Sequence, residues 1–135
     1  MAAYIAENGE TPDLVLCSTA LRARQTLDRL ADQFKPLPEI RYDDALYLAD
    51  QHQILARIHD IGRDWGKVLV IGHNPGLQRL ARGLVERANP RDAARIDSKF
   101  PTAGLVVLKA ELEAWCDFSP DTVRAAAFVA PKHLV

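Results

Sequence analysis

Short, continuous apolar runs alternate along the chain with stretches in which apolar residues recur at helical spacing. The runs Leu14–Cys17 and Val68–Ile71 are bounded by polar residues, as expected of strands that are covered on both faces. Each run is followed by a one-sided apolar stripe, over residues 23–34 and 77–85, which predicts an amphipathic helix. The pattern of strand, turn and helix therefore occurs twice.

The rest of the chain carries weaker signals of the same kind. Asp50 is a candidate N-cap for a helix whose apolar stripe spans residues 54–61 and which ends at Gly62. The polar segment Asn89–Lys99 predicts a loop with some helix. Three further strands are expected, the last two as an antiparallel pair at a sheet edge: Glu39–Tyr42, Gly104–Leu108 and Thr122–Val129.

This order of elements predicts the fold class. Strands that alternate with helices form a mainly parallel sheet with helices on both faces, so we expect an α/β fold of three layers with an antiparallel C-terminal edge. The chain has 135 residues, of which 48% are hydrophobic, and this is enough for one ordinary core. Residues 1–135 are therefore predicted to form a single domain.

Polar residues suited to anion binding follow both of the strongly predicted strands. In a parallel sheet such turns lie at the carboxyl edge, where helix N-termini present free N–H groups. After the first strand come Ser18 and Arg22. A cation in a first helical turn opposes the helix dipole unless an anion lies nearby, although Arg22 is equally well explained as a solvated surface residue. After the other strand come His73 and Asn74, with Asn74 as a candidate N-cap and Pro75 at the first helical position.

His73 is the more informative of these residues, because a rigid strand and a Pro-started helix hold it at the edge of the sheet. A structural histidine satisfied by local hydrogen bonds is the alternative interpretation. Glycine-rich phosphate loops and the GxSxG motif are both absent from the sequence. The pattern therefore indicates an arginine and a histidine around an oxyanion, with phosphate as the expected ligand.

Composition and charge exclude several other classes of function. Lys and Arg number 17 against 18 Asp and Glu, without a block of like charge, so neither nucleic acid nor a membrane surface is an expected partner. Cys17 and Cys116 lack the spacing of a metal site or a disulfide framework, which favours a reducing cytoplasm. No histidine has partners at metal-ligand spacing, so we expect neither a metal nor another cofactor.

Three motifs in a fixed order resemble the histidine phosphatase superfamily, which includes the phosphoglycerate mutases. They are Ser18-x-x-Leu21-Arg22-Ala23-x-x-Thr26, then Val70-Ile71-Gly72-His73-Asn74-Pro75-Gly76-Leu77, then Phe100-Pro101-Thr102-Ala103. The chain is most similar to the small SixA-type phosphohistidine phosphatases. Only about thirty residues separate Phe34 from Lys67, too few for the bulky lid of the larger branches, which implies an open site for an accessible phosphate.

The resemblance implies a role for each matching residue. Arg22 would be a phosphate-pocket arginine, and His73 the second pocket histidine, which holds the phosphoryl group and stabilises charge in the transition state. Ser18 and Asn74 would make secondary contacts. The implied substrate bears a phosphoryl group, such as a phosphohistidine protein, and the implied mechanism is metal-free. A general acid would come from the region of Asp43, Asp44 and Asp50, although turn and cap roles explain these carboxylates better.

The sequence departs from this family at the nucleophile. Relatives attack phosphorus with the histidine of an Arg-His-Gly motif at the end of their first strand, and no Arg-His pair occurs in this sequence. Residues 1–7 are good helix formers without an N-cap, as expected of a chain that enters partway through a helix. We therefore expect an N-terminally truncated domain that has lost its first strand from a whole of ~160 to 170 residues, and that is inactive as it stands.

Two other interpretations remain open at this stage. A non-catalytic phosphoanion-binding or interaction module would retain Arg22 and His73 without the nucleophile. An unrelated doubly wound domain with two coincidental polar turns would have no such site. In the truncated case, the exposed apolar strand edge beside Val68–Ile71 predicts poor solubility, pairing with a partner or a rearranged sheet.

Overall fold

A computed structural model describes residue 5 and the ranges 9–100 and 105–129. The predicted N-terminal helix over residues 1–7 lies outside the described residues, apart from Ile5. The motif that begins at Phe100 also continues beyond them, because residues 101–104 are not described. Within the described residues, no helix is both long and apolar enough to cross a membrane.

The centre of the fold is a parallel three-stranded sheet in the order β2-β1-β3. Its strands are β1 (Leu14–Ser18), β2 (Glu39–Asp43) and β3 (Val68–Ile71), which confirms the three strands expected in this half of the chain. All five residues of β1 are buried. Cys17 pairs with Ile71 and Ser18 with Asp43, so the carboxyl ends of the three strands meet at one edge.

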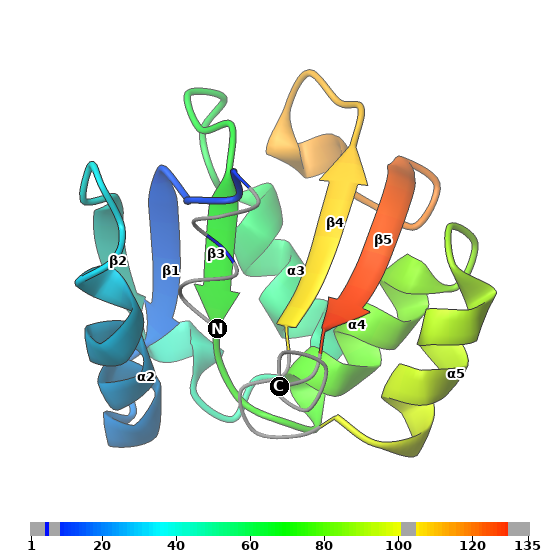
Figure 1. Ribbon diagram of the computed structural model, residues 1–135, viewed down its shortest axis with the longest axis horizontal. Helices are drawn as coiled ribbons and strands as arrows, with labels where there is room; N and C mark the ends of the chain where they lie inside the picture. The colour runs from blue at the N-terminus through cyan, green and yellow to red at the C-terminus, as the bar shows by residue number, and fades with distance from the viewer. Residues whose placement is uncertain (1–4, 6–8, 101–104, 130–135) are drawn as a thin grey trace.

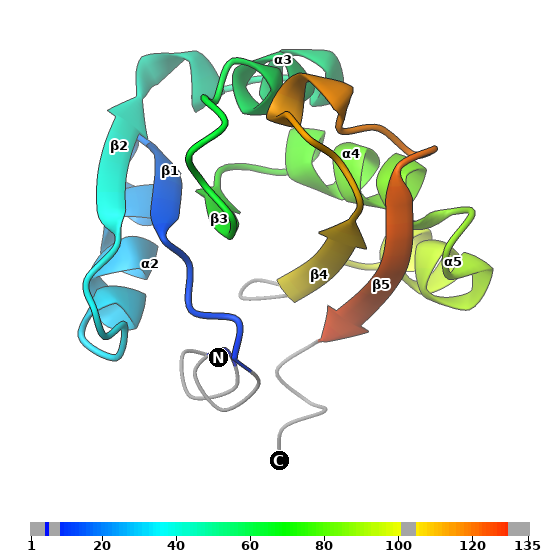
Figure 2. The same ribbon diagram turned by 90° about the horizontal axis from the view of Figure 1, so that it is seen from above.

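Helices cover both faces of this sheet, as the alternating pattern predicts (Figures 1 and 2). Helix α2 (Leu21–Ala31) lies on one face, where its Ala23 and Leu27 pack with buried side chains of β1. Helices α3 (Gln51–His59) and α4 (Gly76–Val85) lie on the other face, where they join the largest apolar cluster. The α/β fold with three layers is therefore confirmed.

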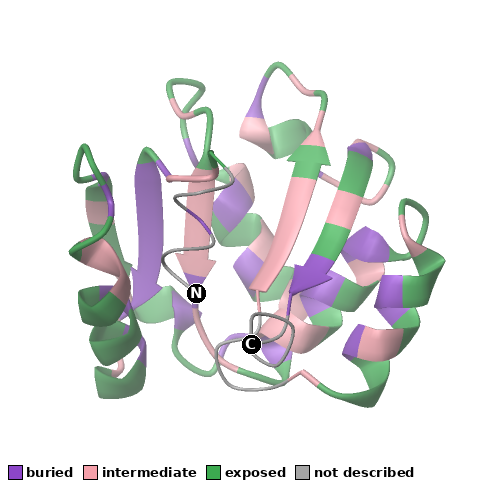
Figure 3. Ribbon diagram, in the orientation of Figure 1, coloured by how far each residue is buried: buried purple, intermediate pink, exposed green. Residues whose placement is uncertain are grey.

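The antiparallel pair is also confirmed, although it forms a sheet of its own. Strand β4 (Leu105–Ala110) pairs with β5 (Val123–Val129), with an irregularity between Lys109 and Ala110. Within the described part of the chain, β3 has no strand partner besides β1, and β4 has none besides β5. Both strands are apolar and mostly half-buried (Figure 3), so each presents an unpaired apolar edge.

The segment predicted mainly as a loop is a helix, α5 (Pro90–Ser98). Asn89 caps it by accepting a hydrogen bond from the Asp92 N–H at 3.1 Å. Asp92 is buried, and its Oδ2 accepts a hydrogen bond from the Phe128 N–H at 2.9 Å, which fastens α5 to β5. Only Ala93 and Ile96 give this polar helix an apolar face, and that is too few to stand out in the sequence.

The helix starts differ in detail from the sequence predictions. Asp50 caps α3 in a reciprocal capping box with Gln53, as its position predicts. Helix α4, however, begins one residue later than expected, at Gly76 with Pro75 as its N-cap, so the prediction that Asn74 caps this helix was wrong. Asn74 is instead exposed and free of a capping role.

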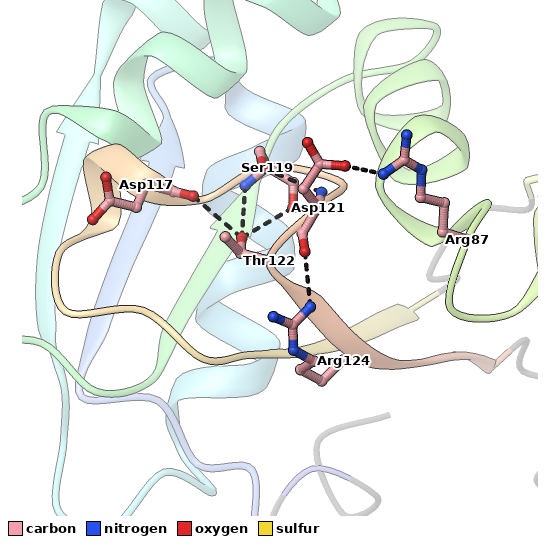
Figure 4. Close-up of polar contacts among 6 residues, drawn as sticks. All are labelled: Arg87, Asp117, Ser119, Asp121, Thr122 and Arg124. Atoms are coloured by element: carbon pink, nitrogen blue, oxygen red, sulfur yellow. Dashed lines mark hydrogen bonds and ion pairs between the residues drawn. The ribbon is translucent and has the colours of Figure 1, made fainter.

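The loop before β5 is held by a local network of polar contacts (Figure 4). The Thr122 hydroxyl accepts a hydrogen bond from the Ser119 N–H at 3.0 Å, and Arg124 donates to the Asp121 carbonyl at 2.8 Å. Arg87, which follows α4, forms an ion pair with the Asp121 carboxylate. These contacts connect the antiparallel pair to the end of α4.

Candidate active site

The carboxyl edge of the parallel sheet brings Ser18 and His73 together. Ser18 ends β1 and His73 lies two residues beyond the end of β3, and the Ser18 Oγ is 2.8 Å from the Nε2 of His73. The Ser18 side chain has 0% exposure, and its Oγ also accepts a hydrogen bond from the Ala20 N–H at 3.2 Å. A fully buried hydroxyl therefore fixes the orientation of a partly exposed imidazole.

A second wall of the site comes from the loop between the short 3-10 helix η1 (Asp44–Leu46) and α3. The ring of Tyr47 meets the His73 ring edge-on, with centroids 5.7 Å apart and an angle of 85° between the planes. Glycine at position 76 permits this arrangement, because a Cβ there would collide with the carbonyl oxygen of Ala49. Gly76 thus lets the start of α4 lie directly against this loop.

A pocket of about 150 Å³ opens between this loop and the start of α4. His73, Asn74 and Leu48 line it, and Arg79 adds an exposed side chain one turn into the helix. The structure therefore places Asn74 beside His73, at the site though not as a helix cap. Three residues of the site were not predicted from the sequence: Tyr47, Leu48 and Arg79. Of these, only Arg79 had a sequence signal, since it lies one helical turn after Gly76.

Arg22 lies in the first turn of α2 at the same edge of the sheet. Its side chain is exposed, and its guanidinium makes no hydrogen bond or ion pair with a described residue. The structure shows no contact between Arg22 and His73. The neighbouring Arg24 stacks over the Tyr42 ring, 5.5 Å from its centroid, so of these two arginines only Arg22 stays available for an anion.

The carboxylates considered as general acids mostly serve the fold. Asp43 accepts hydrogen bonds from the Ala45 N–H at 2.9 Å and from the Arg57 Nε at 2.7 Å, and Asp50 belongs to the capping box of α3. Asp44 lies in η1 and is exposed. The turn and cap roles that their positions predict for Asp43 and Asp50 are therefore confirmed.

A larger pocket, of about 400 Å³, lies beside β2 and α3. Its arginines are already paired, Arg41 with Glu39 at 2.8 Å and Arg57 with Asp43 at 2.7 Å. No described histidine lines this pocket. Its size alone does not make it an anion site, because both of its arginines are paired with carboxylates and Asp44 adds a further negative charge.

Neither candidate nucleophile near His73 is suited to attack. Cys17 is buried, and this burial raises the pKa of its thiol from 9.0 to about 11, so the reactive thiolate is scarce at neutral pH. Ser18 is beyond the reach of a phosphorus atom, because no part of it is exposed. The described residues also contain no group of three or more potential metal ligands.

Comparisons with known proteins agree with this arrangement. No family model matches the chain. It is 30% identical to a candidate phosphohistidine phosphatase SixA from Agrobacterium tumefaciens, whose structure superposes with a TM-score of 0.76 over 96% of this chain and 75% of the other. The chain belongs to the histidine phosphatase superfamily, in its SixA-type branch.

The chain is also similar to other proteins. A candidate SixA from Nakamurella multipartitia superposes with a TM-score of 0.79 at 27% identity, over 96% of this chain and 77% of that one. An uncharacterized protein of Mycobacterium tuberculosis is 34% identical over 131 residues, which cover 96% of this chain and 80% of the relative. The fold alone is shared, at 20% identity and a TM-score of 0.69, with the protein histidine phosphatase SixA in complex with tungstate, over 99% of this chain and 78% of that one.

Proposed function

We propose that this domain belongs to a metal-free phosphatase that hydrolyses phosphohistidine in proteins through a phosphohistidine enzyme intermediate. The observation that carries the proposal is the hydrogen bond between Ser18 and His73, which holds an imidazole at the carboxyl edge of the sheet, the edge at which α2 begins with Arg22 in its first turn. A helix N-terminus, an arginine and a histidine are together complementary to a phosphoryl group.

In this mechanism an enzyme histidine attacks phosphorus while the bond from phosphorus to the substrate nitrogen breaks. The leaving imidazole takes up a proton, and a water molecule then attacks the enzyme phosphohistidine to release inorganic phosphate and restore the free histidine. His73 and Arg22 would hold the equatorial oxygens, and Asn74 would contact the phosphoryl group at the edge of the pocket. Ser18 would act through His73 by fixing its ring.

We further propose that the attacking histidine lies on a strand that precedes residue 1. No Arg-His pair occurs in the sequence, and neither Ser18 nor Cys17 is suited to replace the histidine. Strands β3 and β4 both have half-buried apolar residues and an unpaired edge within the described part of the chain. A strand inserted beside β3 in parallel would end at the carboxyl edge, next to His73.

The test compares hydrolysis by three proteins: the 135-residue chain, the same chain extended by the segment encoded directly upstream of Met1, and this extended chain with its Arg-His histidine replaced by alanine. We expect phosphate release from a phosphohistidine protein only from the extended chain, together with a labelled enzyme intermediate that is stable to base. Equal activity of the 135-residue and extended chains would refute the assignment of the nucleophile.

A second candidate function follows from the same lack of a nucleophile. The domain would then bind a phosphoanion through Arg22 and His73 without turning it over. Titration calorimetry with orthovanadate on the wild type and on Arg22→Ala tests this function. Binding that Arg22→Ala abolishes, with no hydrolysis by the extended chain, would favour the binding module over the enzyme.

A further inference from the structure

Leu48 has an unusual backbone conformation for its residue type. Its φ is 57°, and no other described residue apart from glycine has a positive φ. The left-handed region is unfavourable for a residue with a branched or bulky side chain on its Cβ, whereas glycine and asparagine adopt it easily. The side chain is also 78% exposed, so the leucine gains no burial in return.

The neighbours of Leu48 hold it in this conformation. Leu46 is buried in the main apolar cluster, and Ala49 is buried with its carbonyl against Gly76. Asp50 begins α3 with its capping box. With its backbone strained and its apolar side chain exposed, this leucine stabilises the fold no more than asparagine would at the same position. Backbone strain of this kind is found most often at functional sites.

The surroundings of Leu48 indicate what it contacts. It lines the 150 Å³ pocket together with His73, and this volume falls below the roughly 300 Å³ or more of a typical small-molecule site. The pocket therefore has room for about one side chain. Arg79 also lines it, exposed and without an ion-pair partner among the described residues. A chain segment that presents a phosphoryl group to His73 would place its adjoining residues here.

We propose that Leu48 and Arg79 form a flank subsite, which recognises the residues next to the phosphorylated side chain of a protein substrate. Leu48 contacts an apolar residue of that segment, and Arg79 pairs with an acidic one. The proposal rests on the proposed function and deepens it, because a free phosphorylated metabolite offers no such adjoining residues. The residues that adjoin the phosphorylated side chain therefore determine binding together with the phosphoryl group.

A peptide library tests the subsite without depending on turnover. Each peptide carries phosphoryltriazolylalanine, a stable analogue of phosphohistidine, flanked by randomised positions, and the bound fraction is sequenced. We expect the wild-type chain to enrich apolar and acidic residues at fixed offsets from the analogue. Leu48→Asn should abolish the apolar enrichment and weaken an enriched peptide about tenfold, and Arg79→Gln should abolish the acidic enrichment.

Two controls separate this role from a structural one. Leu37→Asn makes the same substitution at a leucine that is 65% exposed on the loop before β2, at the opposite edge of the sheet, and should keep the enrichment. Leu48→Asn should melt at or above the wild-type temperature, because asparagine suits the left-handed region, so a loss of enrichment in this variant would not come from unfolding.

The outcomes distinguish this proposal from the proposed function. A flat library profile in the wild type, or an unchanged profile in Leu48→Asn, would overturn the flank subsite even if the free analogue binds. Failure to bind either the free analogue or any peptide would overturn both proposals. A wild-type dimer that Leu48→Asn dissociates would assign Leu48 to self-association and overturn its role in recognition.

Discussion

The Oγ of Ser18 lies 2.8 Å from the Nε2 of His73, although 55 positions separate the two residues in the sequence. The contact exists because β1 and β3 are adjacent and parallel, so the residues that follow them emerge at the same edge of the sheet. One of the partners is fully buried and the other reaches the surface. The core thereby fixes the orientation of a ring that is open to a ligand.

Replacing Ser18 by alanine should weaken anion binding more than it weakens the fold. His73 loses the group that orients its ring, and the Ala20 N–H loses its acceptor. We expect orthovanadate affinity, measured by calorimetry, to fall about tenfold and the free energy of unfolding to fall by about 1 kcal/mol. Ser98→Ala removes an exposed hydroxyl that bonds to the Arg95 carbonyl and should change neither quantity. Unchanged vanadate affinity in Ser18→Ala would argue against the orienting role.

The two glycines of α4 should respond in opposite directions to alanine. At Gly76 the added Cβ collides with the Ala49 carbonyl, so Gly76→Ala should lower the free energy of unfolding by about 1 to 3 kcal/mol and displace the loop that carries Tyr47. At Gly83 nothing lies within 4 Å of an added Cβ, so Gly83→Ala should stabilise the helix by about 0.5 to 1 kcal/mol. Urea unfolding measures both. Equal effects of the two substitutions would contradict the close approach at Gly76.

Removing the Asp92 carboxylate should loosen α5 from β5. The group accepts from the Phe128 N–H at 2.9 Å and from Arg95 at 2.8 Å, and asparagine keeps only one acceptor oxygen for these donors. We expect Asp92→Asn to lower the free energy of unfolding by about 1 to 3 kcal/mol. Asp97→Asn breaks only an exposed ion pair with Arg82 and should cost less than about 0.5 kcal/mol. Similar losses in the two variants would refute this anchoring role.

Stability should decline in the alkaline range because of Cys17. Burial raises the pKa of its thiol from 9.0 to about 11, so the unfolded chain releases this proton at a lower pH than the folded one. The contribution of the protonated thiol is therefore complete below about pH 9 and is lost as the pH rises towards about 11. Urea unfolding across this range should show a steeper decline in the wild type than in Cys17→Ala. If the free energy of unfolding had the same pH dependence in both proteins, Cys17 would not be the cause of the decline.

The sequence predicted those parts of the structure that depend on local patterns. The continuous apolar runs of β1 and β3 are strong signals, since a strand covered on both faces is apolar at every position. The stripe of α4 is equally clear, since a helix buried on one face has apolar residues at helical spacing. The polar α5 was predicted only as a loop with some helix, because its cap and its buried Asp92 stabilise it through contacts that leave no periodic pattern in the sequence.

The candidate site was predictable only in part, for the same physical reason. Ser18 and His73 follow strands, so sheet topology brings them to one edge. Tyr47 and Leu48 reach the site through the contact between Ala49 and Gly76, which depends on how two distant elements pack. No local rule links a residue in that loop to a histidine beyond another strand.

The two unpaired strand edges have a consequence for amide hydrogen exchange. The amides of β1 lie between two parallel neighbours and should exchange only in rare, large openings, whereas β3 and β4 each have neighbours on one side alone within the described residues. Amide exchange rates measured for each strand therefore report whether β3 and β4 gain a further hydrogen-bonded neighbour. If the extended chain adds the proposed strand beside β3, exchange should slow in β3 and β4 together and stay almost unchanged in β5, which would show the two sheets joining into one cooperative unit.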